Sequence, residues 1–268
     1  MNGYQLLDSG DGRKWERFGP YILCRPCPVA VWKAAQHIEA DASFSRDEGS
    51  RWTYRRKVPS AWDIEYGGMT WRIAPTDFGH LGLFPEHVSL WQWMSQQMHR
   101  GDKVLNLFAY SGGGTVIAAQ AGALVCHLDA SKGMVDWAKD NALRNGLEKA
   151  PIRWIVDDAM KFLKREIKRG SRYEGILLDP PTFGRGSQGE VFKIEEGILP
   201  LLELCKAVLS TQPRFLVFSC HTPGLTPLVL QHLLTQVFGL CSESGEMFLA
   251  ADKTFSIPSG AYARIRYD

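Results

Sequence analysis

The strongest constraint on the fold is an alternation of short apolar runs with longer amphipathic stretches after residue 100. Apolar runs of about four to eight residues between turn formers predict buried strands, and apolar residues at every third or fourth position predict helices. Five strand–helix units in succession predict a parallel sheet that carries helices. We expect strands at 103–108, 123–129, 152–158, 173–181 and 214–220, and helices at 115–122, 131–146, 159–170, 195–210 and 227–239.

The end of the chain departs from this alternation. Residues 245–251 and 260–267 both have strand character, and no helix is expected between them. Two such strands can pair as an antiparallel hairpin at the edge of the sheet. The predicted fold class is therefore α/β, a Rossmann-like sheet that is mostly parallel and ends in a C-terminal antiparallel hairpin.

The first 75 residues have a different composition. Seven of the nine tryptophans precede residue 94, and the apolar stretches before residue 76 are short and rich in turn formers. We predict a small, mostly β domain over residues 1–75, with one helix near 30–40 and a role in substrate recognition. The α/β domain would then cover residues 76–268.

Composition narrows the class of protein. The chain has 268 residues, 45% of them hydrophobic, and a net charge of only +2, so any surface for nucleic acid must be local. The sequence has neither a membrane-spanning apolar run, which needs about 20 residues, nor a recognisable signal peptide, which predicts a cytoplasmic protein with reduced cysteines. Cys24 and Cys27 form a lone C-x-x-C pair without nearby histidines, so no metal is expected.

A glycine-rich turn follows the first strand of the α/β region. It reads Asn106-Leu-Phe-Ala-Tyr-Ser-Gly-Gly-Gly-Thr115, and its glycines allow a ligand to approach the backbone closely. The G-x-G-x-x-G spacing of dinucleotide-binding loops is absent. Taken alone, the segment fits a flexible connection as well as it fits a ligand-binding loop.

Acidic residues end the next two expected strands. Asp129 follows the second strand, where a carboxylate can accept both hydroxyls of a ribose. Asp157 and Asp158 end the third strand, where they can either accept an adenine amino group or cap the following helix. Because parallel strands end at one edge of a sheet, these residues together predict a nucleoside site.

Two further strand ends carry residues suited to chemistry. The fourth strand ends in Asp179-Pro180-Pro181, a rigid turn that can present a carboxylate and carbonyl oxygens to a planar amino-bearing group, with Phe183 available for stacking. The fifth strand ends at Cys220, next to His221. That cysteine is either a nucleophile activated by its surroundings or a small apolar residue of the core.

Taken as a set, these segments resemble class I S-adenosylmethionine-dependent methyltransferases related to the bacterial 23S ribosomal RNA large-subunit cytosine-C5 and guanine-N7 methyltransferases. The resemblance rests on NLFAYSGG, Asp129, the VDDA at 156–159, DPPTF and FSC, together with a stretch at 79–87, and it covers roughly residues 76–268. It implies methyl transfer from S-adenosylmethionine, an RNA substrate, and a Phe84–Glu86 segment near the methionine end of the cofactor. The expected cofactor site comprises Phe84, Pro85, Glu86, Asn106, Phe108, Ala109, Tyr110, Ser111, Gly112, Gly113, Asp129, Ala130, Ser131, Asp157, Asp158, Ala159 and Asp179. The expected catalytic residues are Asp179, Pro180, Phe183 and Cys220.

The target atom stays open at this point. Thr182 occupies a position where many RNA cytosine-C5 methyltransferases have a second cysteine, and the first 75 residues do not resemble the RNA-binding module of the ribosomal enzymes. Two mechanisms fit: addition of a Cys220 thiolate to cytosine, or direct transfer to a base nitrogen oriented by Asp179 and the Pro180 carbonyl. A small-molecule or protein substrate is the alternative. The oligomeric state is also open.

Two segments are candidate surfaces for RNA. Residues 51–57 interleave aromatic and basic side chains, a pattern that suits stacked bases and phosphates but equally suits a charged strand edge. A basic stripe follows the helix expected at 159–170, and the solvated face of an amphipathic helix is its simpler interpretation. The stripe consists of Lys161, Lys164, Arg165, Lys168 and Arg172.

Overall fold

A computed structural model describes residues 3–47, 49–185, 189 and 191–267. The chain divides into two compact units. The first comprises Met1–Val88 and Phe248–Ser259, and the second comprises Ser89–Met247 and Gly260–Asp268. The tip of the C-terminal hairpin thus belongs to the first unit, although the strands that carry it start and end in the second.

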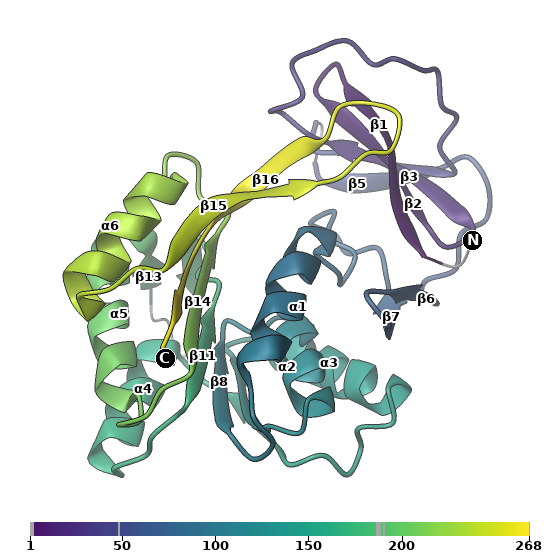
Figure 1. Ribbon diagram of the computed structural model, residues 1–268. Coiled ribbons are helices and arrows are strands. Elements are labelled where there is room, and N and C mark those ends of the chain that lie inside the picture. The colour runs from purple at the N-terminus through teal and green to yellow at the C-terminus, as the bar shows by residue number, and fades with distance from the viewer. Residues whose placement is uncertain (1–2, 48, 186–188, 190, 268) are drawn as a thin grey trace. The chain divides into compact units, whose positions relative to one another are not determined.

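The second unit is built on a seven-stranded sheet with the order β10-β9-β8-β11-β14-β16-β15. The first five strands in that order are parallel, and β16 runs antiparallel to β14, which confirms the predicted fold class (Figure 1). The chain starts in the middle of the sheet with β8 and later returns to the other side of it with β11. Such a reversal opens a crevice at the carboxyl ends of the strands. The strands are β8 (Lys103–Leu107), β9 (Leu124–Asp129), β10 (Ile152–Val156), β11 (Gly175–Leu178), β14 (Phe215–Cys220), β15 (Glu243–Leu249) and β16 (Ile257–Arg266).

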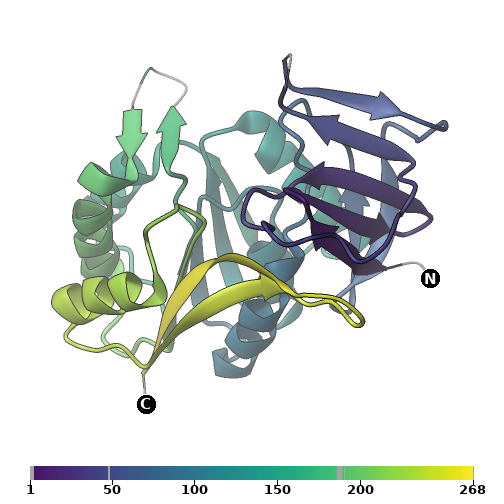
Figure 2. The ribbon, with the colours of Figure 1, turned by 90° about the horizontal axis from the view of Figure 1, so that it is seen from above.

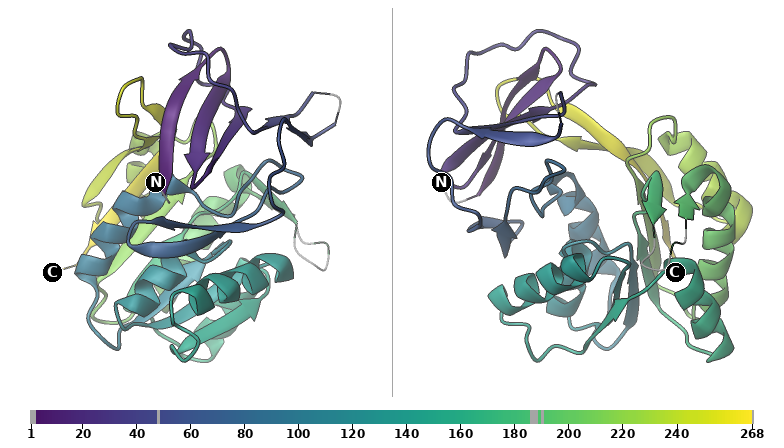
Figure 3. Two further views of the ribbon diagram at one scale, coloured as in Figure 1. Left: turned by 90° about the vertical axis from the view of Figure 1, so that its right-hand side faces the viewer. Right: turned by 180° about the vertical axis from the view of Figure 1, so that it is seen from behind.

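Helices cover both faces of this sheet (Figures 1 and 3). One face carries α1 (Val88–Gln97), α2 (Gly113–Gln120) and α3 (Lys132–Arg144), and the other carries α4 (Ala159–Lys168), α5 (Ile194–Val208) and α6 (Pro227–Phe238). Side-chain caps begin three of the helices, because the Ser131, Asp158 and Thr226 oxygens accept backbone N–H groups of the first turn. Pro200 lies inside α5 rather than at its start.

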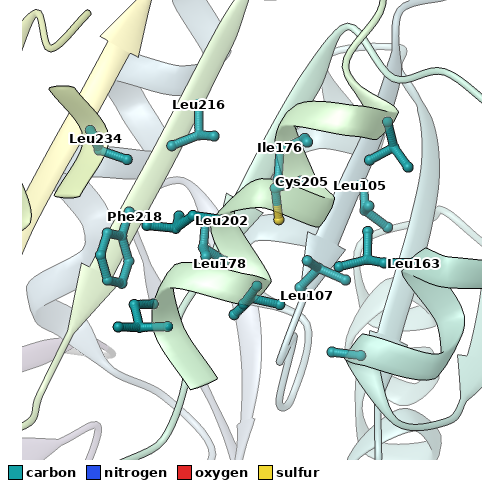
Figure 4. Close-up of a cluster of buried hydrophobic side chains, with 14 of the residues drawn as sticks. Leu105, Leu107, Leu163, Ile176, Leu178, Leu202, Cys205, Leu216, Phe218 and Leu234 are labelled. Carbon is teal, nitrogen blue, oxygen red and sulfur yellow. The ribbon is translucent and has the colours of Figure 1, made fainter. Parts of the chain in front are cut away.

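The core of the second unit follows from the alternation of side chains along the strands. Alternate residues of the central strands face α4, α5 and α6, where they form a continuous apolar cluster (Figure 4). Burial of each large apolar side chain contributes roughly 1.5–3 kcal/mol, so this cluster holds the strand ends in fixed register. Its labelled members are Leu105, Leu107, Leu163, Ile176, Leu178, Leu202, Cys205, Leu216, Phe218 and Leu234.

The first unit is mostly β, as expected. Its five-stranded sheet comprises β1 (Tyr4–Gly10), β2 (Arg13–Phe18), β3 (Tyr21–Pro26), β4 (Ala42–Ser45) and β5 (Arg51–Tyr54), and a separate hairpin comprises β6 (Trp62–Tyr66) and β7 (Met69–Ile73). A short 3₁₀ helix, η1, spans Pro85–His87. Residues from the hairpin tip complete an apolar cluster here, since Leu249 and Ile257 pack with Leu6, Cys27 and Ala30.

One local expectation is wrong, and one pair of strands was not expected. The helix expected near residues 30–40 is absent, and that segment is an irregular loop. Carboxylates of the β1 strand and its turn hold the loop, because Asp8 accepts the amide of Gln36 at 2.8 Å and Asp11 accepts that of Ala34 at 3.1 Å. These bonds offer the backbone an alternative to helical ones. The sequence also did not indicate the antiparallel pair β12 (Phe183–Arg185) and β13 (Val191–Lys193), which follows Pro181 (Figure 2).

Among the residues described, none of the helices has the length and apolar character that a membrane crossing requires.

Candidate active site

Strand register brings the predicted site residues to one edge of the sheet. Leu107 at the end of β8 is paired with Leu128 of β9 on one side and with Leu178 of β11 on the other. Asp129 and Asp179 directly follow these two partners. The glycine-rich turn therefore starts between the two carboxylates.

The turn itself, Phe108–Gly112, has an unusual backbone. Phe108 and Tyr110 have φ angles of 54° and 51°, in a region that costs non-glycine residues about 1–2 kcal/mol each. Gly112 has φ of 87°, and a Cβ atom there would lie 2.7 Å from Cβ of Ala138 in α3. Only glycine fits at this position, which explains one glycine of the motif without reference to a ligand.

Asp129 is held at the end of β9 by two backbone amides. Its Oδ2 accepts the N–H of Tyr110 at 2.9 Å, and its Oδ1 accepts that of Ser131 at 2.8 Å. Burial raises the pKa of this carboxyl above its usual value, although the two amide bonds act in the opposite direction. A carboxylate has about four acceptor positions, so each oxygen can accept one more donor, as a ribose diol requires.

Asp157 and Asp158 both have roles within the protein. Asp158 is the N-cap of α4, where its Oδ1 accepts the amide of Lys161 at 2.8 Å. Asp157 accepts the amide of Asp158 and forms an ion pair with Arg165. The predicted capping alternative is thus confirmed for Asp158. The cap uses one oxygen, and the second oxygen of a carboxylate can accept a further donor.

Asp179 begins the turn after β11, and its side chain is 26% exposed. Its Oδ2 lies 3.6 Å from Nε2 of His221, the residue that follows β14. A hydrogen bond of 2.8 Å between the hydroxyls of Thr182 and Thr222 ties the two turns together. Pro180 is buried, whereas the ring of Phe183 is 51% exposed. A partly open carboxylate thus follows a strand next to the glycine-rich turn, and an exposed aromatic ring lies four residues further along the chain.

Cys220 has the surroundings of a core residue. Its side chain is completely buried in the apolar cluster between the sheet and α4–α6, and its Sγ accepts the amide of Thr222 at 3.4 Å. Burial raises the pKa of the thiol, and the charge of Asp179 adds to this effect, against the lowering by hydrogen bonds from Thr222. The protonated, unreactive form is therefore favoured in this conformation.

Comparison with known proteins identifies the family. A family model described as S-adenosylmethionine-dependent methyltransferase matches residues 23–204. The chain belongs to this family. A crystal structure of an S-adenosylmethionine-dependent methyltransferase from Agrobacterium tumefaciens is 35% identical, with a TM-score of 0.94 over 99% of this chain and 91% of that one. A methyltransferase structure from Streptococcus mutans has a TM-score of 0.79 over 100% of this chain and 76% of that one but only 18% identity, which shows the fold alone.

The curated relatives are larger proteins. Ribosomal RNA large subunit methyltransferase K/L from Syntrophotalea carbinolica is 33% identical over 159 residues, which is 59% of this chain and 22% of that protein. The protein of the same name from Marinobacter nauticus is 33% identical over 180 residues, 65% of this chain and 24% of its own length. The chain therefore matches about a quarter or less of each relative's length.

The cofactor of this methyltransferase is S-adenosylmethionine. Its nucleoside needs acceptors for a ribose diol, and the free acceptor positions of Asp129 beside the turn suit that need. Phe84, Pro85 and Glu86 lie in the first unit, where Glu86 is buried and its Oε1 accepts the hydroxyl of Ser259 at 2.7 Å. Their expected place near the methionine end of the cofactor stays a prediction.

Sequence reasoning missed several polar residues beneath the methyltransferase's glycine-rich turn. Asn106 was expected at the cofactor, but its side chain is buried and donates to Thr115 at 3.0 Å. Thr115, His127 and Asn141 were not singled out, and all three are completely buried. The available signal was a polar residue at an interior position, such as the histidine inside the apolar run ALVCHLD.

The two candidate RNA surfaces are partly neutralised. Arg55 pairs with Glu39 and Asp41, and Arg56 also pairs with Asp41, so part of the basic charge at 51–57 is compensated within the first unit. On α4, Arg165 pairs with Asp157. These pairs compensate Arg55 and Arg56 in the first segment and Arg165 in the second.

Proposed function

We propose that this methyltransferase transfers a methyl group to a base nitrogen in ribosomal RNA. One observation carries the proposal: the register of β11 and β8 sets Asp179 and Pro180 next to the start of the glycine-rich turn. The relatives named for ribosomal RNA support the choice of substrate. The buried, protonated thiol of Cys220 favours a nitrogen over cytosine C5, which would require a cysteine adduct.

Within this proposal the cofactor lies across the ends of β8, β9 and β10. Phe108–Gly113 line it, Asp129 accepts the ribose hydroxyls, and Ala130 and Ser131 continue that wall. Asp158 and Ala159 face the adenine, with Asp157 supporting them. S-adenosylmethionine supplies an electrophilic methyl group on a sulfonium, so the protein needs mainly to orient the acceptor nitrogen in line.

The orienting groups are those of the D-P-P turn. The Asp179 carboxylate and the Pro180 carbonyl accept N–H groups of the base and direct the lone pair of the reacting nitrogen, and Phe183 stacks on the base. A carboxylate also accepts the proton when the nitrogen that is methylated carries one. These roles require the carboxylate form of Asp179.

Nucleoside mass spectrometry of ribosomal RNA, from cells with and without the gene, tests the proposal. We expect one methylated base to be lost without the gene, and to return with the wild-type gene but not with Asp179→Asn. An unchanged set of methylated nucleosides would contradict an RNA substrate. A methyl group found on cytosine C5 would contradict the nitrogen target but would leave the RNA substrate in place.

The alternative is a small-molecule or protein substrate. It is favoured by the paired arginines at 51–57 and by the small net charge. Salt separates the two, because RNA affinity falls steeply with ionic strength as phosphate counterions are released, whereas affinity for a small neutral substrate does not.

A further inference from the structure

A group of polar side chains lies buried beneath the glycine-rich turn of the second unit. Asn106 is 6% exposed, and Thr115, His127 and Asn141 are not exposed at all. They come from β8, α2, β9 and α3, respectively. Burial of polar groups costs free energy unless they are hydrogen-bonded, so the hydrogen bonds of these side chains are needed to stabilise the buried group.

Hydrogen bonds link Asn106, Thr115 and His127 in a row. The amide nitrogen of Asn106 can only donate, so the hydroxyl of Thr115 accepts from it at 3.0 Å. The same hydroxyl is also hydrogen-bonded to Nδ1 of His127, 2.9 Å away. Burial lowers the pKa of His127 to about 3, so its ring is neutral. The Thr115 hydroxyl thus connects the side chains of Asn106 and His127.

These bonds fix both ends and the apex of the turn. Asn106 precedes the turn and Thr115 follows it, so their hydrogen bond closes the loop at its base. The amide nitrogen of Asn141 donates to the carbonyl of Ser111 at 2.8 Å and holds the apex against α3. Between these points Tyr110, with its φ of 51°, directs its N–H to Asp129. A residue with positive φ keeps that conformation only where its surroundings impose it.

We propose that Thr115 and Asn141 are positioning residues for S-adenosylmethionine, acting through the conformation of Phe108–Gly112 and the Tyr110 amide that orients Asp129. Neither residue touches the cofactor in this proposal. The inference rests on the cofactor lying over the turn, as proposed above. It adds that side chains beneath the turn, which do not touch the cofactor, contribute to its affinity.

Thr115→Val is the sharpest test, because valine keeps the shape of threonine and removes only the hydroxyl. We expect the dissociation constant for S-adenosylmethionine, measured by calorimetry, to rise about tenfold. Thr115→Ser restores the hydroxyl and should restore most of the affinity. At saturating cofactor, kcat and the KM for RNA should stay close to wild type, which a general loss of the fold would not allow.

Ile176→Val provides the matched control. Ile176 is completely buried in β11, on the other face of the sheet, and its shortening lowers stability without touching the turn. We expect this variant to bind S-adenosylmethionine with wild-type affinity even where its melting temperature falls as far as that of Thr115→Val. Equal losses of affinity in both variants would overturn the proposal, because stability alone would then explain them.

Asn141→Ala tests the second contact independently. We expect a several-fold weaker cofactor affinity, again with an unchanged KM for RNA. Should this variant fail to fold, Thr115→Val still decides the proposal. Asp129→Ala separates this proposal from the cofactor's location: if Asp129→Ala binds normally, the location is wrong, whereas if only Thr115→Val binds normally, the positioning role is wrong.

Discussion

The contacts of the polar residues at the strand ends differ between the two halves of the central sheet. At the ends of β9 and β10, Asp129 and Asp158 accept backbone amides at 2.8–2.9 Å, and Asn141 holds the glycine-rich turn that follows the neighbouring strand β8. At the ends of β11 and β14, Asp179 and His221 are 3.6 Å apart and about one-third exposed or less. The carboxylates of the first half are held by backbone amides, whereas the Asp179 carboxylate of the second half faces the side chain of His221.

This difference fits two separate roles, with the cofactor bound by the first half and the acceptor base bound by the second. A nucleoside cofactor has the same shape in every turnover, so its side of the sheet gains from rigid acceptors that cost no reorganisation on binding. The acceptor base must enter and leave, and its side keeps groups that are partly solvated. Substitutions in the first half should therefore change cofactor affinity, and substitutions in the second half should change the rate of methyl transfer.

The largest effect is expected at Asp179. Asp179→Ala should lower kcat by roughly a thousandfold, because loss of the carboxylate removes an interaction made to the reacting base. The affinity for S-adenosylmethionine, measured by calorimetry, should stay within a few-fold of wild type. Asp179→Asn is the shape-matched control and should recover only a small part of the rate. Loss of cofactor binding in both variants would show that Asp179 belongs to the cofactor half instead.

The next effect is expected at Asp129. Asp129→Ala should raise the dissociation constant for S-adenosylmethionine about a hundredfold, because two charge-assisted bonds to the ribose are lost together. Asp136→Ala serves as the control, since Asp136 is an exposed acid of α3 that pairs with Lys132 and Lys139. Calorimetry on both variants measures the effect. Equal affinities for the two would contradict the ribose assignment.

The fold of the second unit was largely accessible from the sequence, for a physical reason. Buried parallel strands need continuous apolar runs, and the helices between them carry their own start signals, such as Ser131 before α3. The loop at 30–40 was not accessible, because the carboxylates that hold it, Asp8 and Asp11, lie more than twenty residues away in the chain. Local propensity contains no information about such partners.

The candidate site shows the same limit. Strand ends can be placed by pattern, so Asp129 and Asp179 were found. The direction of a side chain at a strand end depends on which face of the sheet it occupies. Cys220 falls on the same face as Phe218 and Leu216, in the core. Asn106 and His127 are neighbours because β8 pairs with β9, and Thr115 of α2 contacts both.

A smaller effect is expected from pH, again in the cofactor half. Burial raises the pKa of Asp129, so the carboxyl takes up its proton at a higher pH than an ordinary aspartate. As the pH falls through that value, a protonated Asp129 loses acceptor strength, and affinity for S-adenosylmethionine should fall by up to about tenfold per pH unit. Calorimetry between neutral and mildly acidic pH measures this, and Asp129→Asn should flatten the curve.

The same group has the opposite effect on stability. Between the unfolded and the raised folded pKa, the folded chain binds more protons than the unfolded chain, so the contribution of Asp129 to stability decreases as the pH rises through that interval. Acidification should therefore weaken cofactor binding while it makes the contribution of Asp129 to the free energy of unfolding more favourable. Denaturant unfolding of the wild type and of Asp129→Asn isolates that contribution. A pH-independent affinity would mean that the carboxyl is not the ribose acceptor.

The smallest effect on methyl transfer is expected at Cys220, which ends β14 in the second half of the sheet. A nucleophilic thiol would need to be exposed and ionised, whereas Cys220 is completely buried and its pKa is raised by that burial. Cys220→Ala should keep methyl transfer within about twofold of wild type and lower the free energy of unfolding by about 1 kcal/mol, as expected for a small core truncation. RNA containing 5-fluorocytidine should form no covalent complex with the enzyme. A trapped complex that Cys220→Ser abolishes would require the end of β14 to rearrange on substrate binding, and it would return the cytosine-C5 mechanism in place of nitrogen methylation.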